Sequence, residues 1–536
     1  MEGLTAESPD GRIIPGAAIR WNISRDGKTY TFYLRRDALW SNGDPVTAQD
    51  FVYGLRRSAD PATASKYAQV LLPIENAPEV ISGDLPPEEL GVSAMDEFTL
   101  QISMRDPTPY FLALLSHSST YPVHQPSVEA HGSAFSRPGN LVSNGAYILS
   151  EWVIRSRIVL VKNQNYWDAE NVVLEKVNYF PFEDQSTALK RFRAGKLHWT
   201  SEVPNNQFKW LQKHYPNELV ISPWLGSYYF GFNLEREPFI ENRGLRMALM
   251  LALDRDLLTE KVTQFGELPS FTLVPPGIRD YISPEPEWAA WTQEEREAEA
   301  RRLFEMAGYS KDNPLEFEIR YTGGENNKKM ALAASSLWKQ VLGVQATLLN
   351  EEQKVFLQNR EQKINTQVFQ AGWISDYADP YSFLNLFRSG HGLNHYGYSN
   401  SLYDALLDEV AAERIPSIRR RLMFETERLL LNDVPFIPLY THVTKRMVNP
   451  RLLGWESNVM DHHYSKHMYF LKAAPAEEAA EAVVIDSETG AAEPFQAPAD
   501  PGGGDEAIVE ETVVTDQVEP PDDGKEGETT PEDKLE

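Results

Sequence analysis

The stretch that sets the expected fold reads Thr29-Tyr-Thr-Phe-Tyr-Leu-Arg35 and is followed by Trp40-Ser-Asn-Gly-Asp-Pro-Val-Thr-Ala-Gln-Asp-Phe51. Tyr30, Phe32 and Leu34 fall on one face of an extended chain, and this period of two predicts a half-buried strand. Thr47 is a suitable N-cap for a helix that would turn Phe51 toward the core. The stretch therefore predicts a strand, a turn and a helix in that order.

The same order of elements recurs farther along the chain. Residues 315–321 alternate again, and residues 328–342 carry apolar side chains at helical spacing. Gly343 comes directly after that segment and is a typical helix C-cap. Residues 98–104 add a further alternating strand. Because strands and helices are interleaved along the chain, we predict an α/β protein.

Composition narrows the classes of function. The chain has 536 residues, of which 42% are hydrophobic, so two or three hydrophobic cores can form. No run approaches the roughly 18 consecutive apolar residues that a membrane-spanning helix needs. The formal charge of −27 disfavours binding to phosphate backbones, and we expect no nucleic-acid partner. The absence of cysteine excludes thiol catalysis, disulfides and thiolate zinc sites.

Much of the negative charge lies at the carboxyl end. Residues 473–536 contain 20 Asp and Glu residues and two Lys residues, which gives a net charge of −18. The segment is rich in Ala, Pro, Gly, Glu and Thr and has one aromatic residue, Phe495. Too little apolar surface is available there to offset the loss of chain entropy on folding. We therefore expect a disordered acidic tail that serves as a spacer, or that binds a basic partner.

Further short blocks follow the opening stretch, and they include Asp60-Pro-Ala-Thr-Ala-Ser65, Asn144-Gly-Ala-Tyr147, Asn165-Tyr-Trp-Asp168, Arg246-Met-Ala-Leu-Met-Leu-Ala-Leu-Asp-Arg255 and Ala371-Gly-Trp-Ile-Ser-Asp-Tyr377. In this order, from residue 1 to about residue 472, the chain resembles the extracytoplasmic solute-binding proteins of family 5, in particular the oligopeptide-binding proteins of peptide ABC transporters. The acidic tail lies outside the resemblance.

The resemblance implies a type II periplasmic-binding-protein fold of cluster C, an α/β fold with two main lobes, a hinge and a small extra domain. The expected small domain covers residues 1–125. Lobe I covers residues 126–225 and 450–472, lobe II covers residues 226–449, and the tail covers residues 473–536.

The resemblance also implies a function. Proteins of this family capture oligopeptides in the cleft between the lobes and deliver them to the permease subunits of an ABC transporter. We therefore expect a monomeric receptor that is not an enzyme and has no cofactor and no metal site. Its expected location is periplasmic or extracytoplasmic, either soluble or anchored as a lipoprotein. The family's first strand and an export signal normally precede the segment that matches Met1–Leu4, so we expect an upstream in-frame coding segment.

Asp376 is the residue expected to bind the amino end of the peptide. In the family, the carboxylate at this position holds the ligand's α-ammonium, and a buried ammonium needs such a partner. From the residues alone, Asp376 could instead cap the turn before Tyr377 and Pro380.

Other positions of the cleft follow from the same resemblance. Trp373 is expected to wall the cleft and Gly372 to expose main-chain groups, although a core tryptophan and a bend glycine would look the same. Tyr67, Trp224 and Tyr229 fall at cleft-lining aromatic positions, with ordinary core packing as the alternative.

Three cationic positions of the family are replaced in this chain. Gln370 stands where short-peptide receptors have an arginine that faces the ligand carboxylate, Asn327 replaces a histidine, and Thr263 replaces a lysine. A carboxylate without a counter-charge in a closed cleft is costly. Either Arg360, the matching arginine that remains, supplies the charge, or the ligand is longer, modified or uncharged at that end.

Competing functions rest on weaker patterns. His462, His463 and His467 could ligate a metal, but we assign no ligand to them. Asp376 and Asp379 could act as an acid/base pair, yet no nucleophile elbow, phosphate loop or HExxH motif accompanies them. A scaffold or chaperone-like protein is a third class. Within the binding class, murein peptide, nickel, haem or a sugar are alternative ligands.

Deletion of residues 473–536 tests the expected tail. Because the segment has no core to contribute, the melting temperature and the ligand affinity should change little. Differential scanning calorimetry and a ligand titration on the shortened chain would measure both. A drop of several degrees would show that the tail docks on the folded part.

Overall fold

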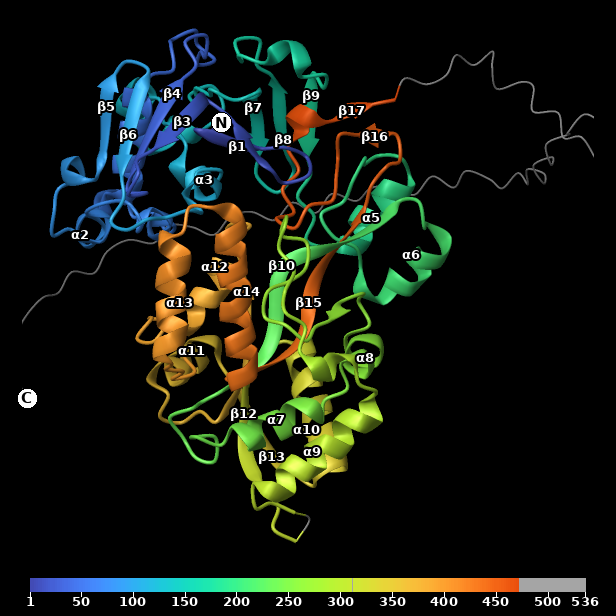
Figure 1. Ribbon diagram of the computed structural model, residues 1–536. Coiled ribbons are helices and arrows are strands. Elements are labelled where there is room, and N and C mark those ends of the chain that lie inside the picture. The colour runs from blue at the N-terminus through green and yellow to red at the C-terminus, as the bar shows by residue number, and fades with distance from the viewer. Residues whose placement is uncertain (311, 472–536) are drawn as a thin grey trace, which may run out of the picture. The chain divides into compact units, whose positions relative to one another are not determined.

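The computed structural model describes residues 1–310 and 312–471, which Figure 1 shows in colour. Residues Met1–Leu471 form one compact unit. The predicted disordered tail, residues 473–536, lies outside the described residues. Within the part that the structure describes, no helix is long and apolar enough to cross a membrane.

The amino-terminal region is built on a four-stranded antiparallel sheet of order β3-β4-β6-β5. Its elements are β3 (Ala18–Ile23), β4 (Thr29–Leu34), β5 (Val92–Asp96), β6 (Thr99–Ser103) and the helices α1 (Ala48–Ala59), α2 (Ala77–Ser82), α3 (Phe111–Leu114) and α4 (Gln125–His131). Tyr30 and Phe32 of β4 pack with Phe51 of α1 in one core. The N–H of Thr47 donates to the Asp50 carboxylate at 2.7 Å and fixes the start of α1. The predicted strand, turn and helix are confirmed.

Three smaller sheets complete this end of the described part. The strands are β1 (Thr5–Glu7), paired with β2 (Ile13–Pro15), and β7 (Tyr147–Val153), β8 (Arg157–Lys162) and β9 (Lys176–Tyr179) in sequential antiparallel order. The helices α5 (Gln185–Arg193) and α6 (Phe208–His214) follow, and near the end of the described chain β16 (Leu452–Leu453) pairs with β17 (Tyr469–Phe470).

The largest sheet has six strands in the order β11-β15-β10-β14-β12-β13. The strands are β10 (Leu219–Phe232), β11 (Leu268–Pro269), β12 (Glu316–Thr322), β13 (Gln345–Glu351), β14 (Val368–Ile374) and β15 (Phe436–Met447). The helices of this region are α7 (Arg243–Leu251), α8 (Arg255–Leu257), α9 (Gln293–Met306), α10 (Glu325–Leu342), α11 (Gln353–Gln362), α12 (Tyr381–Leu384), α13 (Ser401–Ala412) and α14 (Pro416–Asp433).

Helices cover both faces of this sheet. Phe230 on one face packs with Leu245 of α7 and Trp338 of α10, whereas Tyr229 on the other face shares a core with side chains of α13 and α14. The helix predicted at residues 328–342 is confirmed as α10, and it ends at Gly343 in the left-handed conformation, as expected for a C-cap.

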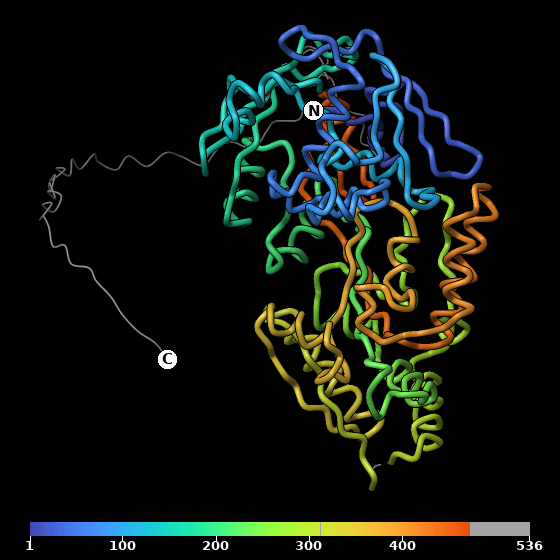
Figure 2. Tube along the Cα trace, turned by 90° about the vertical axis from the view of Figure 1, so that its left-hand side faces the viewer, coloured from blue at the N-terminus to red at the C-terminus, as the bar shows by residue number. Residues whose placement is uncertain are grey.

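β10 and β15 run lengthwise through the described part, and Figures 1 and 2 both show the amino-terminal region toward one end of these strands and α9 and α10 toward the other, while α13 and α14 lie alongside them. They are the longest strands of the described residues, with 14 and 12 residues, and they pair antiparallel with irregular register near Pro223 and Tyr228. The boundary predicted after residue 225 falls inside β10, and the one predicted after residue 449 falls shortly after β15. The division into a small domain and lobes I and II stays a prediction, and the names are used for the residues given above.

Glu427 of α14 is a carboxyl group fully enclosed in lobe II, with 0% exposure. Its oxygens accept the N–H groups of Leu273 and Val274 at 3.0 and 2.9 Å and the hydroxyl of Tyr281 at 2.7 Å. Burial raises the pKa of Glu427 to about 7, although these hydrogen bonds act to lower the pKa. The group therefore anchors the loop 273–281 onto α14 while it holds a proton that the unfolded chain would release.

The substitution Glu427→Gln should make folding stability less sensitive to pH. Between pH 4.5, the ordinary carboxyl value, and about 7, the folded chain keeps the proton and the unfolded chain loses it, so the wild type loses stability as the pH rises. The wild type should lose up to about 3 kcal/mol relative to the Gln variant across this range, at about 1.36 kcal/mol per pKa unit. Denaturant unfolding at several pH values would measure it, and a difference that does not vary with pH would contradict the assignment.

Candidate ligand-binding site

β14 offers an edge that is open to an added strand. Its residues pair with β10 along the full length, from Gly226 opposite Ile374 to Phe232 opposite Val368. On the other side β12 pairs only with the first residues of β14, at Val368 and Phe369. Among the described residues no strand covers that side beyond Phe369. Such an edge presents N–H and C=O groups to which an extended peptide can bind.

Gly372 lies in this open part of β14 and is itself exposed. A Cβ atom at this position would lie 2.8 Å from the Ser227 carbonyl oxygen of β10, which is too close for any other residue without a shift of the backbone. Trp373 is half-buried, and its indole N–H donates to the Ser382 hydroxyl at 2.9 Å. Glycine thus keeps β14 close to β10, and the fixed indole borders the edge.

Asp376 follows directly after β14 and is exposed, and within the described residues its carboxylate has no hydrogen bond or ion pair. The turn that follows is held by other groups. The Ser375 hydroxyl donates to the Tyr377 carbonyl oxygen at 2.6 Å, and the Asp379 carboxylate accepts the N–H of Tyr381 at 2.9 Å. Asp376 therefore does not cap the turn, and its charge is available to a ligand.

His117 is a neighbour of Asp376 that the sequence did not single out. Burial lowers the pKa of His117, and the charge of Asp376 acts in the opposite direction. The ring of Tyr67 lies 5.3 Å from the His117 ring, centroid to centroid, and the Tyr67 side chain is 51% exposed. Tyr67 of the small domain therefore lies against the His117 ring, and the charge of Asp376 of lobe II is close enough to act on the same imidazole. No spacing or motif around His117 could have indicated this.

At the other end of the open edge, the candidate residues form a network of neutral groups. Gln370 Oε1 accepts the N–H and the hydroxyl of Thr322 at 3.2 and 3.3 Å, and Asn327 Nδ2 donates to the same hydroxyl oxygen at 3.3 Å. The Tyr228 hydroxyl reaches Asn327 Oδ1 at 3.5 Å. Trp224 lies instead near the Asp376 end, because the next residue, Leu225, accepts the N–H of Ser375 at 2.9 Å; its side chain is half-buried, with its ring centroid 6.2 Å from that of His442.

Thr263 cannot replace the cation that the family has at its position. Its hydroxyl donates to the Glu267 carboxylate at 2.8 Å, so an acidic group stands beside it. The only acid-base partner of Glu267 within ion-pair distance in the described residues is Lys445, at 3.8 Å. This end of the site therefore offers no free positive charge from Gln370, Asn327 or Thr263.

Tyr229 was expected to line the cleft, but the structure places it in the core of lobe II. The side chain is 1% exposed, its hydroxyl is hydrogen-bonded to the Tyr396 hydroxyl at 2.8 Å, and its ring packs against Phe436. β10 alternates its side chains between the two faces of the sheet, and Tyr229 points to the face that α13 and α14 cover. We therefore leave Tyr229 out of the candidate site.

Arg360 is a half-buried cation on α11 without an acidic partner among the described residues. Its guanidinium lies 5.4 Å from the centroid of the Phe356 ring, and its Nε is buried without a hydrogen-bond partner in the described part of the chain. Burial, followed by the charge of Arg360, lowers the pKa of His395 to about 4. The guanidinium can therefore bind an anionic group of a ligand.

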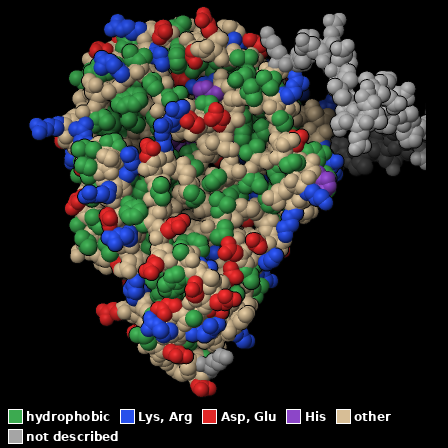
Figure 3. Space-filling model, turned by 45° about the vertical axis from the view of Figure 1, so that its right-hand side comes forward, with side chains coloured by type: hydrophobic (Ala, Val, Ile, Leu, Met, Phe, Trp, Pro, Cys, Tyr) green, Lys and Arg blue, Asp and Glu red, His purple; other side chains and the backbone are tan. Residues whose placement is uncertain are grey.

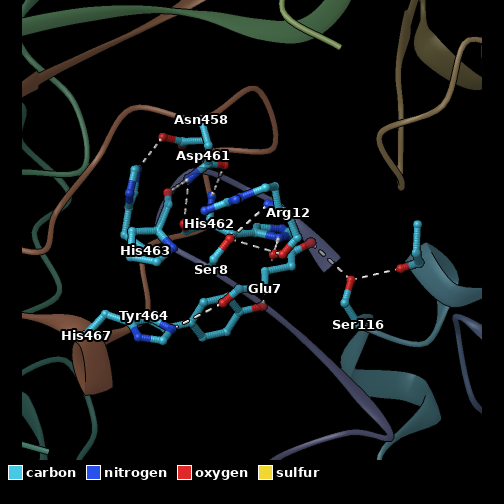
Figure 4. Close-up of polar contacts among 12 residues, drawn as sticks. Glu7, Ser8, Arg12, Ser116, Asn458, Asp461, His462, His463, Tyr464 and His467 are labelled. Carbon is cyan, nitrogen blue, oxygen red and sulfur yellow. Dashed lines mark hydrogen bonds and ion pairs between the residues drawn. The ribbon is translucent and has the colours of Figure 1, made fainter. Parts of the chain in front are cut away.

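The histidines that could have formed a metal site make other contacts. His462 Nδ1 lies 2.7 Å from a Glu7 carboxylate oxygen, His463 Nε2 lies 2.9 Å from Asp461, and His467 Nε2 lies 3.2 Å from the Glu7 carbonyl oxygen (Figure 4). Over residues 1–310 and 312–471, no three or more His, Asp or Glu side chains are grouped as metal ligands.

Asp379 is held by Arg419, whose guanidinium donates to both carboxylate oxygens at 2.6 and 3.0 Å. The pair is largely buried, with side-chain exposures of 14% and 10%. This carboxylate is committed to a structural ion pair, so it does not form an acid/base pair with Asp376.

Comparison with known proteins identifies the family. Residues 12–395 match the model of the bacterial extracellular solute-binding proteins, family 5, middle region. The chain belongs to this family. It is 39% identical to the periplasmic oligopeptide-binding protein OppA of Escherichia coli over 476 residues, which are 88% of this chain and 87% of that protein.

Solved structures of family 5 members confirm the predicted type II periplasmic-binding-protein fold. The unliganded open form of MppA, a periplasmic murein tripeptide-binding protein, has a TM-score of 0.82 at 37% identity, covering 88% of this chain and 92% of that one. Haemophilus influenzae OppA in complex with the peptide RPPGFSPFR has a TM-score of 0.67 at the same identity, covering 88% and 93%.

Gly372→Ala should weaken this family 5 site through its backbone. The added methyl group must push β14 away from the Ser227 carbonyl, so the protein should lose about 1 to 3 kcal/mol of stability, the usual cost of overpacking. Gly392→Ala is the matched control, because nothing lies within 4 Å of the Cβ that it would add. Thermal unfolding of both variants would measure the effect, and equal small losses would contradict the close approach of β14 and β10.

Proposed function

We propose that this protein is an extracytoplasmic receptor that captures oligopeptides along β14 and delivers them to an ABC permease. The observation that carries the proposal is the open edge of β14, which ends at the free carboxylate of Asp376. An extended peptide can continue the sheet on this edge, and its charged amino end then meets a counter-charge. Membership of a solute-binding family and the likeness to OppA support the same function.

Main-chain pairing explains why such a receptor could accept many sequences. Backbone N–H and C=O groups are common to all peptides, so the edge of β14 recognises a peptide without reading its side chains. Tyr67, Trp373 and Trp224 are exposed or half-buried around the site and offer apolar surfaces to side chains of different shape. We expect waters to satisfy polar ligand side chains in the remaining space.

The carboxyl end of the ligand meets a different environment. Gln370 and Asn327 are neutral and already bonded to Thr322, so they do not compensate a terminal carboxylate. Arg360 is the cation that this part of the chain retains, and its buried Nε lacks a partner in the described residues. We infer that the ligand either places a carboxylate at Arg360 or extends its carboxyl end out of the site.

The finer points of the function are inferred from the same residues. The receptor acts as a monomer. It carries out no chemistry on its ligand, since the Asp379 carboxylate is paired with Arg419 and does not act as an acid or base. It works outside the cytoplasmic membrane, either soluble or attached by a lipid anchor. On the face shown in Figure 3, basic and acidic side chains are interspersed, which fits a protein that does not bind nucleic acid.

Asp376→Asn should lower the affinity for an unmodified peptide by about 30- to 5,000-fold, which corresponds to roughly 2 to 5 kcal/mol for breaking a desolvated charge pair. N-acetylation of the peptide should weaken binding to the wild type strongly and to the Asn variant much less. Both changes remove the same interaction, so their effects should not add. Calorimetry on the four combinations gives the coupling directly.

Asp312→Asn is the matched control, because Asp312 is exposed and precedes β12, which runs parallel to β14, so it lies at the opposite end of the sheet. The affinity of the Asp312→Asn variant for the unmodified peptide should equal that of the wild type. Fully additive losses, or unimpaired binding of the acetylated peptide to the wild type, would mean that Asp376 does not hold the amino end.

A further inference from the structure

A second cavity lies apart from the proposed peptide site, at the seam between the small domain and lobe II. Its volume is about 320 Å³. Gly27 and Pro107 line it from the small domain, and Ala378, Pro416 and Met423 line it from lobe II. None of the residues proposed above to contact the peptide is among the described residues that line it.

Four arginines reach this cavity, and they are Arg279, Arg414, Arg419 and Arg420. The lining has two carboxylates, Asp379 and Glu413. The local formal charge is therefore +2, although the whole chain carries −27. A positive cavity in so acidic a protein runs against the overall composition, and the contacts of each arginine show where the surplus lies.

Of the charged side chains that line the cavity, Arg419 and Asp379 form an ion pair with each other, and the other three arginines have little or no acidic compensation. Arg419 is bound to Asp379 through both carboxylate oxygens. The Glu413 carboxylate accepts the N–H of Ile415 at 2.6 Å. Arg420 is half-buried, and in the described part of the chain it has neither a hydrogen bond nor an ion pair.

The remaining two arginines are poorly compensated. Arg279 is 67% exposed, and its Nε lies 3.9 Å from the Asp280 carboxylate, near the limit of an ion pair. Arg414 donates from its guanidinium to the Ser24 carbonyl oxygen at 2.7 Å, across the seam. This neutral acceptor fixes the direction of Arg414 without removing its charge.

The position of these arginines does not serve the helix that carries them. Arg419 and Arg420 are in the first two turns of α14, and the first turn of α14 has no acidic residue. Positive side chains near a helix amino terminus oppose the helix dipole and do not stabilise the helix. Arg419 is accounted for by its ion pair with Asp379, whereas no acidic partner compensates Arg420 within the described residues, and an anion in the cavity would do so.

We propose that this cavity binds a small oxyanion of the phosphate class, with Arg279 and Arg420 as its main ligands and Arg414 at its rim. Planar guanidinium groups bind phosphate oxygens through paired N–H donors. The volume corresponds to about ten waters at roughly 30 Å³ each, which leaves room for a hydrated phosphate or for a small organic phosphate. The residues that line it differ from those proposed to bind the peptide along β14.

Isothermal titration calorimetry with sodium phosphate, at an ionic strength held constant with sodium chloride, tests the proposal on the full chain. The wild type should bind phosphate saturably at one site. Arg420→Gln combined with Arg279→Gln should weaken binding at least about tenfold, since the two changes remove the charge-assisted hydrogen bonds to the anion. Arg421→Gln is the matched control on the same helix, because Arg421 is exposed and does not line the cavity.

No saturable binding above the chloride background, or an equal loss in the Arg421→Gln control, would overturn the proposal. Both altered arginines are exposed or half-buried, so unfolding temperatures near the wild-type value should confirm that the variants fold. A parallel titration with glycerol 3-phosphate distinguishes the two sources: tighter binding than phosphate identifies an organic phosphate, and weaker binding identifies the inorganic ion. Peptide affinity, measured on the same variants, should stay unchanged, so failure here is separable from failure of the peptide-binding proposal.

Discussion

The pairing of β10 with β14 is the constraint on which the proposed site depends. β10 runs from the amino-terminal end of the molecule into lobe II and supplies the partner for every residue of β14. Gly372 permits this pairing at a distance that a side chain would prevent. Because β12 leaves β14 after Phe369, the strand is supported on one side and open on the other. An open edge in a folded protein is a liability unless something binds it, and here a ligand can do so.

The seam between the small domain and lobe II is linked to the same edge. Tyr110 of the small domain stacks on Tyr377 at a centroid distance of 4.6 Å and on Tyr381 at 5.4 Å. Tyr377 directly follows Asp376. A rotation of the lobes that disturbs this stack therefore moves the backbone next to the proposed ammonium site. Stacked aromatic pairs are worth about 0.5 to 1.5 kcal/mol, a scale that ligand binding can exceed.

Sequence patterns predicted the elements well where local chemistry decides the structure. The alternation around Phe32, the helix start at Thr47 and the C-cap at Gly343 depend on neighbours a few residues away, and all three are confirmed, although the Thr47 hydroxyl donates to the Asp50 carboxylate and does not accept a backbone N–H. Resemblance to the family supplied the fold and the candidate residues, including Asp376. It was harder to predict on which face of the sheet a side chain lies, because Tyr228 and Tyr229 are adjacent and aromatic but face opposite cores.

Contacts between distant segments were beyond prediction. His117 and Asp376 are far apart in sequence, and nothing in either neighbourhood indicates the other. The arginine-lined cavity combines residues near positions 24, 279 and 420, and each arginine alone looks like an ordinary surface residue. Such sites arise from packing of whole domains, which the local sequence does not encode.

A peptide with a free amino end that binds along β14 should draw lobe I and lobe II together. The chain has no cysteine, so spin labels can be placed without background at Lys213→Cys on α6 and at Lys339→Cys on α10, both exposed. Pulsed electron paramagnetic resonance then reports the distance between α6 and α10. We expect a shift to shorter distances when an unmodified peptide is added and little shift with the same peptide after N-acetylation. An unchanged distance at a peptide concentration that saturates binding, or an equal shift with both peptides, would contradict it.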